Sequence, residues 1–200
     1  MKYLLPIILM LIFSLPAGGQ IITNSITGEE AYRAENKTFI EFDSAKNQTT
    51  VYSPHILFFK SQGTLHNMGE LISANFLFRH EGRSPASAPV TVDLKLISHA
   101  NNTWKFEGAK SRQLTVSVNG ETLISTTLER ISTRKFPNIN VARMRFVEVL
   151  ATPLSFENFQ KIKNGTKVVV QIGKDYKYKL SKNDLKMIDD FISKQIPVKP

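Results

Sequence analysis

The sequence predicts a mainly β protein: an antiparallel β-sandwich of about ten strands with two short C-terminal helices. Two observations support this fold class. Apolar and polar residues alternate along many short segments, and Gly, Pro, Asn or Ser clusters interrupt them at intervals of about 8–12 residues. The helical period occurs only in the last fifty or so residues. A closed barrel is the second choice of architecture.

The clearest local signal is a β-hairpin over 112–128. Apolar and polar residues alternate before the dipeptide Asn119-Gly120, and β-branched residues follow it. Asn and Gly tolerate the positive φ that both central positions of a type I′ turn require. A two-residue turn at 119–120 is therefore expected.

Six strands are expected before this hairpin, after a polar lead-in over 20–37. Pro54 separates two of them and confines their junction to an edge, a kink or a crossover. The expected strands are 38–42, 49–53, 55–60, 70–80, 90–96 and 103–107.

After the hairpin, Pro137 and nearby asparagines predict an irregular connection over 132–140, followed by a long strand over 141–150. Arg143 and Arg145 share one face of that strand with apolar residues. This mixed face predicts an edge position, or arginines that point into a groove.

The C-terminal portion, about 152–196, predicts a helix, a hairpin and a second helix, with the two helices covering one end or face of the sheets. Ser155 is the expected N-cap of the first helix. Ser181 and Asp184 form a variant of the capping box before the second helix. Fifty residues make a poor independent core, so we expect a single domain over 20–200.

Residues 1–19 have the pattern of a secretory signal peptide. Lys2 precedes an apolar run over 4–15, Pro16 interrupts it, and Ala17 and Gly19 offer small residues for cleavage. The run is shorter than the roughly 18–20 residues of a membrane span. We therefore expect a secreted or periplasmic protein with no transmembrane span after cleavage.

The composition narrows the function classes. The chain has no cysteine, which removes thiol catalysis, thiolate metal sites and disulfides. Its formal net charge is +9, and loss of Lys2 with the signal peptide leaves 25 basic against 17 acidic residues, or +8. A basic exported protein is attracted to anionic partners, and export argues against nucleic acid.

The sequence contains no recognisable catalytic or ligand-binding motif. The nucleophile elbow, the phosphate-binding loop, the dinucleotide fingerprint and the calcium loop are all missing, and the four histidines show no metal-ligand spacing. No cofactor, metal site or catalytic residue is therefore predicted. A zinc site built from distant histidines stays open.

Two groups of candidate binding residues remain. The first is a set of basic residues expected to face an anionic partner: Arg130, Arg134, Lys135, Arg143 and Arg145. The second is a set of aromatic residues that could contact an apolar ligand: Phe58, Phe59 and Trp104.

These observations predict an exported, non-catalytic β-sandwich binding protein of the cell envelope or extracellular space. Its partner would be another protein, an acidic glycan or an anionic lipid surface. A carrier of an apolar small molecule or lipid is one alternative. A hydrolase or metal enzyme without a recognisable motif is another.

Overall fold

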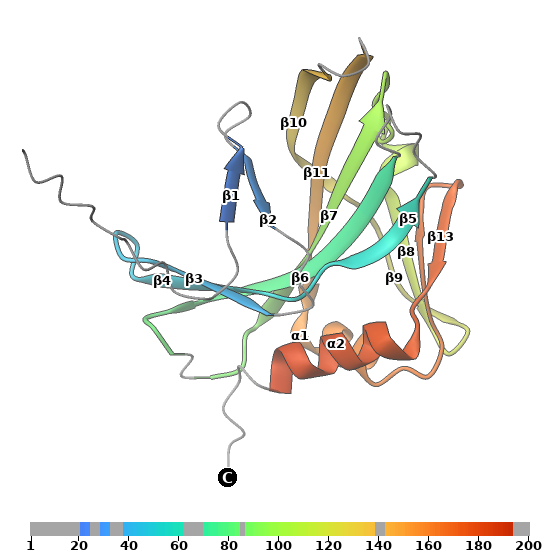
Figure 1. Cartoon of the computed structure of the whole chain (residues 1–200). Helices are drawn as coiled ribbons and strands as arrows, with labels where there is room; N and C mark the ends of the chain where they lie inside the picture. The colour runs from blue at the N-terminus through green and yellow to red at the C-terminus, as the bar shows by residue number, and fades with distance from the viewer. Residues whose placement is uncertain are drawn as a thin grey trace, which may run out of the picture.

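The structure is a computed structural model that describes residues 21–24, 29–32, 38–61, 70–84, 87–138 and 143–193. Two antiparallel sheets and two helices make up most of it, and neither sheet closes into a barrel (Figure 1). The predicted fold class, a β-sandwich with C-terminal helices, is confirmed. The expected signal peptide over 1–19 lies outside the described residues.

The larger sheet has seven strands in the order β10-β11-β7-β6-β4-β3, with β5 also paired to β6. All neighbours are antiparallel. The strands are β3 (Phe39–Asp43), β4 (Gln48–Tyr52), β5 (Ile56–Lys60), β6 (Leu71–Glu81), β7 (Thr91–Asn101), β10 (Glu129–Asn138) and β11 (Arg143–Ser155).

β4 and β5 follow one another along the same edge of β6, and Pro54 lies at the break between them. Ser53 bridges the break: its backbone N–H donates to the Phe76 carbonyl at 2.7 Å, and its hydroxyl accepts from the Phe76 N–H at 2.8 Å. The interruption thus costs few backbone hydrogen bonds, and it lies at the junction that Pro54 was expected to mark.

The smaller sheet has four strands in the order β13-β12-β8-β9, all antiparallel. These are β8 (Gln113–Val118), β9 (Glu121–Thr127), β12 (Val168–Ile172) and β13 (Tyr176–Lys179). The expected turn joins β8 to β9, with φ of 55° at Asn119 and 98° at Gly120. A short 3₁₀-helix, Lys110–Arg112, precedes β8, and a separate hairpin pairs β1 (Ile21–Asn24) with β2 (Glu29–Tyr32).

Helix α1 (Phe156–Lys163) and helix α2 (Lys182–Ser193) lie side by side below the sheets (Figure 1). Ser155 caps α1 by accepting from the Asn158 N–H, as expected. At α2, Ser181 and Asp184 accept from each other's backbone N–H groups, which confirms the capping box. No helix among the described residues is long and apolar enough to cross a membrane.

One hydrophobic core joins both sheets and both helices. Phe78 of β6 packs against Phe191 of α2, and Phe159 of α1 contacts Phe76 and Phe191. On β7 the even-numbered residues from Val92 to Ala100 are buried while the odd-numbered ones stay partly exposed. Alternation along the chain therefore sets which face of each strand is sealed.

Two elements differ from the expectation. The expected connection over 132–140 is in large part the strand β10, which tolerates Pro137 because it is an outer strand. The expected strand over 103–107 is an irregular segment instead. Its backbone N–H groups at Lys105 and Phe106 donate to the Glu148 carboxylate, at 2.7 and 3.1 Å, rather than to a neighbouring strand.

Candidate functional site

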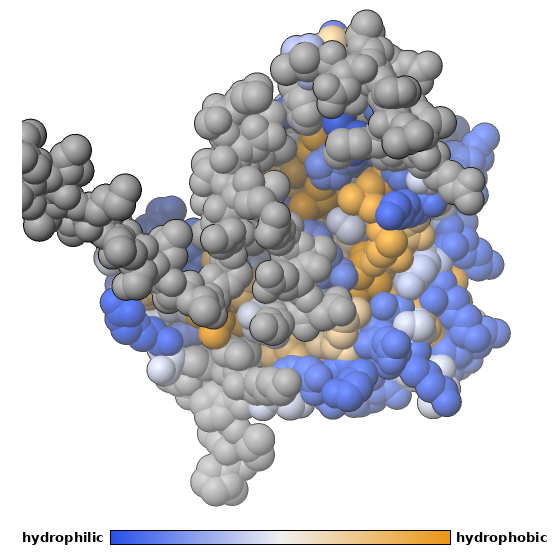
Figure 2. Space-filling model, in the orientation of Figure 1, coloured by the Kyte–Doolittle hydropathy of each residue, from blue (hydrophilic) through white to orange (hydrophobic). Residues whose placement is uncertain are grey.

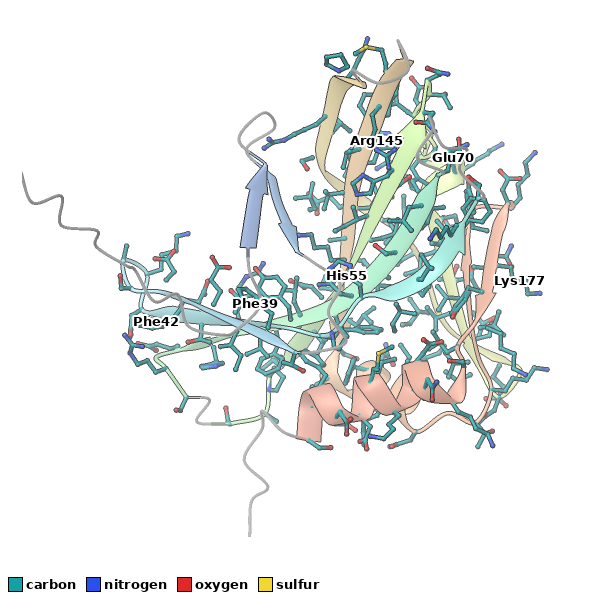
Figure 3. All side chains as sticks on the ribbon, in the orientation of Figure 1. Phe39, Phe42, His55, Glu70, Arg145 and Lys177 are labelled. Atoms are coloured by element: carbon teal, nitrogen blue, oxygen red, sulfur yellow. The ribbon has the colours of Figure 1, made fainter. Side chains whose placement is uncertain are left out.

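The outer face of the four-stranded sheet is exposed, and its basic residues lie on the β12–β13 hairpin. Val168, Val170 and Ile172 of β12 point into the core, so the intervening residues point outward. β13 follows the same alternation, with Lys177 and Lys179 exposed. Figure 3 shows Lys177 projecting away from the body of the molecule. We call the exposed cations of this hairpin the lysine face: Lys167, Lys174, Lys177 and Lys179.

The inward residues of β13 hold this strand in place. Tyr178 stacks on Phe58 of β5, with ring centroids 5.0 Å apart, and Tyr176 contacts the edge of Phe59 at 5.6 Å. The Tyr178 hydroxyl also donates to the Asp184 carboxylate at 2.9 Å. Burial raises the pKa of Tyr178 to about 12, and the Asp184 carboxylate acts in the same direction. The lysines thus project from a strand with a fixed position.

The surroundings of the lysine face are polar and low in negative charge. Among the described residues, no carboxylate points outward from β8, β12 or β13. Asp175 lies in the turn before β13, and Glu121 begins β9 on the far side of the sheet. The remaining outward polar side chains are neutral: Gln113, Thr115, Ser117 and Gln171.

The basic residues predicted from sequence do not form one surface. Arg130 pairs with buried Glu148 at 3.3 Å, and Lys135 lies over the Phe146 ring, 5.7 Å from its centroid. Both contacts are on the core side of the seven-stranded sheet. The strand register places Arg134 and Arg145 on its opposite face. The Arg143 side chain lies outside what the structure describes.

That opposite face also brings together two histidines whose proximity the sequence did not predict. His99 of β7 lies between Val147 and Leu71 in the register, and the His55 ring contacts Ser73 at 3.4 Å. Burial lowers the pKa of both histidines to about 4. The Lys95 ammonium lowers that of His55 further, as Arg145 and His55 do for His99.

The predicted aromatic residues serve mainly as packing contacts. Phe58 packs against the core, while Phe59 keeps 37% of its surface exposed and neighbouring Leu57 keeps 45%. Trp104 meets Phe146 edge to face, with centroids 4.6 Å apart. Figure 2 shows apolar surface within the visible face of the molecule. The contacts of Phe58 and Phe59 with β13 tie the two sheets together at this edge.

No group of three or more His, Asp or Glu side chains that could hold a metal ion occurs in the described part of the chain. Comparisons with protein-family models, with curated proteins and with solved structures gave no match.

Proposed function

We propose that this is an exported, non-catalytic binding protein whose lysine face contacts an acidic polysaccharide of the cell envelope or extracellular space. The observation that carries the proposal is the set of exposed lysines on one hairpin, Lys167, Lys174, Lys177 and Lys179. The signal peptide pattern over 1–19 supports export.

The spacing of these lysines suits a linear anionic chain. Lys177 and Lys179 lie two residues apart on one strand, which separates their Cα atoms by about 7 Å. Lys167 directly precedes β12, next to the end of β13. Charges this close reinforce one another within a Debye length of about 8 Å at physiological salt. Binding should therefore weaken steeply as salt is added.

The chemistry of the face favours a polysaccharide over a lipid bilayer. Proteins that bind membranes at the interface usually insert Trp, Phe or Leu side chains beside their cations. On the outer face of β8, β12 and β13, the apolar side chain among the described residues is Val169, which is half-buried. The neighbouring hydroxyl and amide groups can instead donate hydrogen bonds to sugar hydroxyl and carboxylate oxygens.

The test compares two double variants with the same change in net charge. K177E/K179E reverses two cations of the lysine face. K46E/K161E reverses two exposed lysines elsewhere, each beside an acidic residue. On immobilised polygalacturonate at low salt, K177E/K179E should bind at least about tenfold more weakly than wild type. The control should lose less than about threefold.

Equal losses for the two variants would show that net charge alone drives retention, and would overturn the proposal. Retention of wild type on vesicles containing phosphatidylglycerol but not on polygalacturonate would assign the lysine face to a lipid surface. Unchanged binding by K177E/K179E would place the contact elsewhere on the molecule.

A further inference from the structure

Strand β9, Glu121–Thr127, has a neighbour on one side only. It pairs with β8 and ends the four-stranded sheet, and no other described strand lies along its second edge. An open edge presents unpaired N–H and C=O groups and is a template for pairing with another chain. Whether β9 can pair with a strand of another chain therefore depends on whether its free edge is protected against such pairing.

The other outer strands of the two main sheets carry features that discourage pairing. β10 contains Pro137, several charged residues and a register shift after Arg130. β3 has acidic residues at Glu41 and Asp43 in a strand of five residues. β13 carries Lys177 and Lys179 and adjoins β5. Proline, bulges, edge charges and covering strands are the devices by which proteins block edge-to-edge contacts.

From Ile124 onward β9 lacks these protections, because Glu121 and the bulge both lie at its start. From residue 122 to residue 128 the sequence is Thr-Leu-Ile-Ser-Thr-Thr-Leu, with no charge, proline or glycine. Uncharged segments rich in β-branched residues are those that pair most readily with further strands. The register shift of the β8–β9 pair falls between Val116 and Ser117 of β8, opposite the start of β9. From Ile124 onward β9 therefore pairs regularly.

Helix α1 does not close this edge. The beginning of β9 and α1 border an open groove of about 700 Å³. Its walls include Glu121, Thr122 and Leu123 on one side and Gln160 and Lys161 on the other. A strand approaching the start of β9 would therefore meet open space.

We propose that β9 pairs antiparallel with β9 of a second copy of this chain, so that the two four-stranded sheets become one of eight strands. The sequence is self-complementary in this arrangement. With Thr126 beside the two-fold axis, it lies opposite Thr126 of the other copy and Ser125 lies opposite Thr127, all within the part of β9 that pairs regularly. No like charges face each other, and Thr–Thr pairs are favourable across strands. The contact is isologous, as in most homodimers.

The dimer would also change how the lysine face works, a consequence that rests on the proposed function. A two-fold axis perpendicular to the sheet keeps both outer faces on the same side. Seven inter-strand steps of about 4.8 Å separate the two copies of β13, or about 34 Å. Two lysine faces on one side would bind a polymer bivalently, with higher avidity than either alone.

The test uses charge at Ser125, an exposed residue that lies diagonally across the proposed axis from Ser125 of the other copy. S125K and S125E should each raise the dimer dissociation constant at least about tenfold, because like charges then lie within reach across the interface. An equimolar mixture of the two should recover dimers. T133K, on the exposed part of β10, is the control and should dimerise as wild type does.

Sedimentation equilibrium measures wild type, each variant and the equimolar mixture, and circular dichroism with thermal melts checks that each variant folds. A wild type that stays monomeric at about 100 µM overturns the proposal. So does a dimer that both S125K and S125E leave intact. K177E/K179E should still dimerise, which separates this proposal from the one on polysaccharide binding.

Discussion

At the scale of the residue, Glu148 is a charged side chain that is almost fully buried in the core. It keeps 1% of its surface exposed, and it accepts hydrogen bonds from the backbone of Lys105 and Phe106 and from Arg130. A buried carboxylate is stable only with such partners. Here the partners belong to an irregular segment and to β10, so one residue fixes both against β11.

We therefore predict that E148Q destabilises the protein by about 2–3 kcal/mol, because the amide accepts less strongly and leaves Arg130 without its carboxylate. E129Q changes an exposed glutamate at the start of β10 and should cost less than about 0.5 kcal/mol. Urea unfolding of the two variants measures both values. A loss below about 1 kcal/mol for E148Q would show that the segment is held by its apolar contacts alone.

This residue also shows what the sequence could not predict. Arg130 was interpreted as a partner-binding residue because it is one of several basic residues close together in this part of the chain. Its carboxylate lies eighteen residues further on, across a strand pair. One signal was available: Glu148 falls on the same strand face as Phe146 and Leu150, and an acid on a buried face needs a cation.

At the scale of the element, the β8–β9 hairpin joins local turn chemistry to a contact with β12. The Asn119 side-chain oxygen accepts from the Thr166 N–H and hydroxyl at 3.1 and 2.8 Å, and from the Lys167 N–H at 3.1 Å. The same residue holds φ at 55°. Asn119 thus sets the turn and also anchors the start of β12.

Three variants separate these two roles. N119A removes the acceptor and strains the positive φ, so a loss of about 2–3 kcal/mol is expected. N119G keeps the backbone relaxed and should lose about 1–2 kcal/mol, the part due to the hydrogen bonds. N119D keeps both features and should stay within about 0.5 kcal/mol of wild type. Thermal unfolding ranks the three, and equal losses for N119G and N119D would contradict the anchoring role.

Elements with strong local signals were predicted well. The Asn-Gly turn, the alternation in β6 and β7 and the caps at Ser155 and Ser181 all depend on neighbours in the chain. β10 was missed because Pro137 argues against a strand, although an outer strand can hold it. The irregular segment over 103–107 was misassigned because its partner is a side chain of β11.

At the scale of the whole molecule, the sequence predicted two sheets but not which strands each contains. The C-terminal hairpin was assigned to no particular sheet from the sequence, and in the structure β12 pairs with β8 and completes the smaller sheet. Only the helices cover the core from below (Figure 1). Such pairing joins residues about fifty positions apart, and alternation within a strand carries no information about its partner.

Two histidines on the larger sheet make the stability of the whole molecule depend on pH. His99 lies on β7 and His55 lies directly before β5, and both share one face with Lys95 and Arg145. Burial holds the pKa of both near 4, below the ordinary value of 6.5. Between these pH values the unfolded chain binds protons that the folded protein does not, so folding is favoured above pH 6.5 and is progressively opposed as the pH falls toward 4.

We therefore predict that the free energy of unfolding falls as the pH is lowered from about 7 to 5, by on the order of 2 kcal/mol per histidine once solvent screening is allowed for. The double variant H55Q/H99Q keeps two neutral polar side chains and should show little of this loss. H80Q should keep it, because His55 and His99 both remain. Urea unfolding at several pH values checks the slope. If wild type and H55Q/H99Q lose stability in parallel over this window, then protonation elsewhere in the chain sets the acid sensitivity, and the two histidines lie in a more solvated environment than their position on the sheet implies.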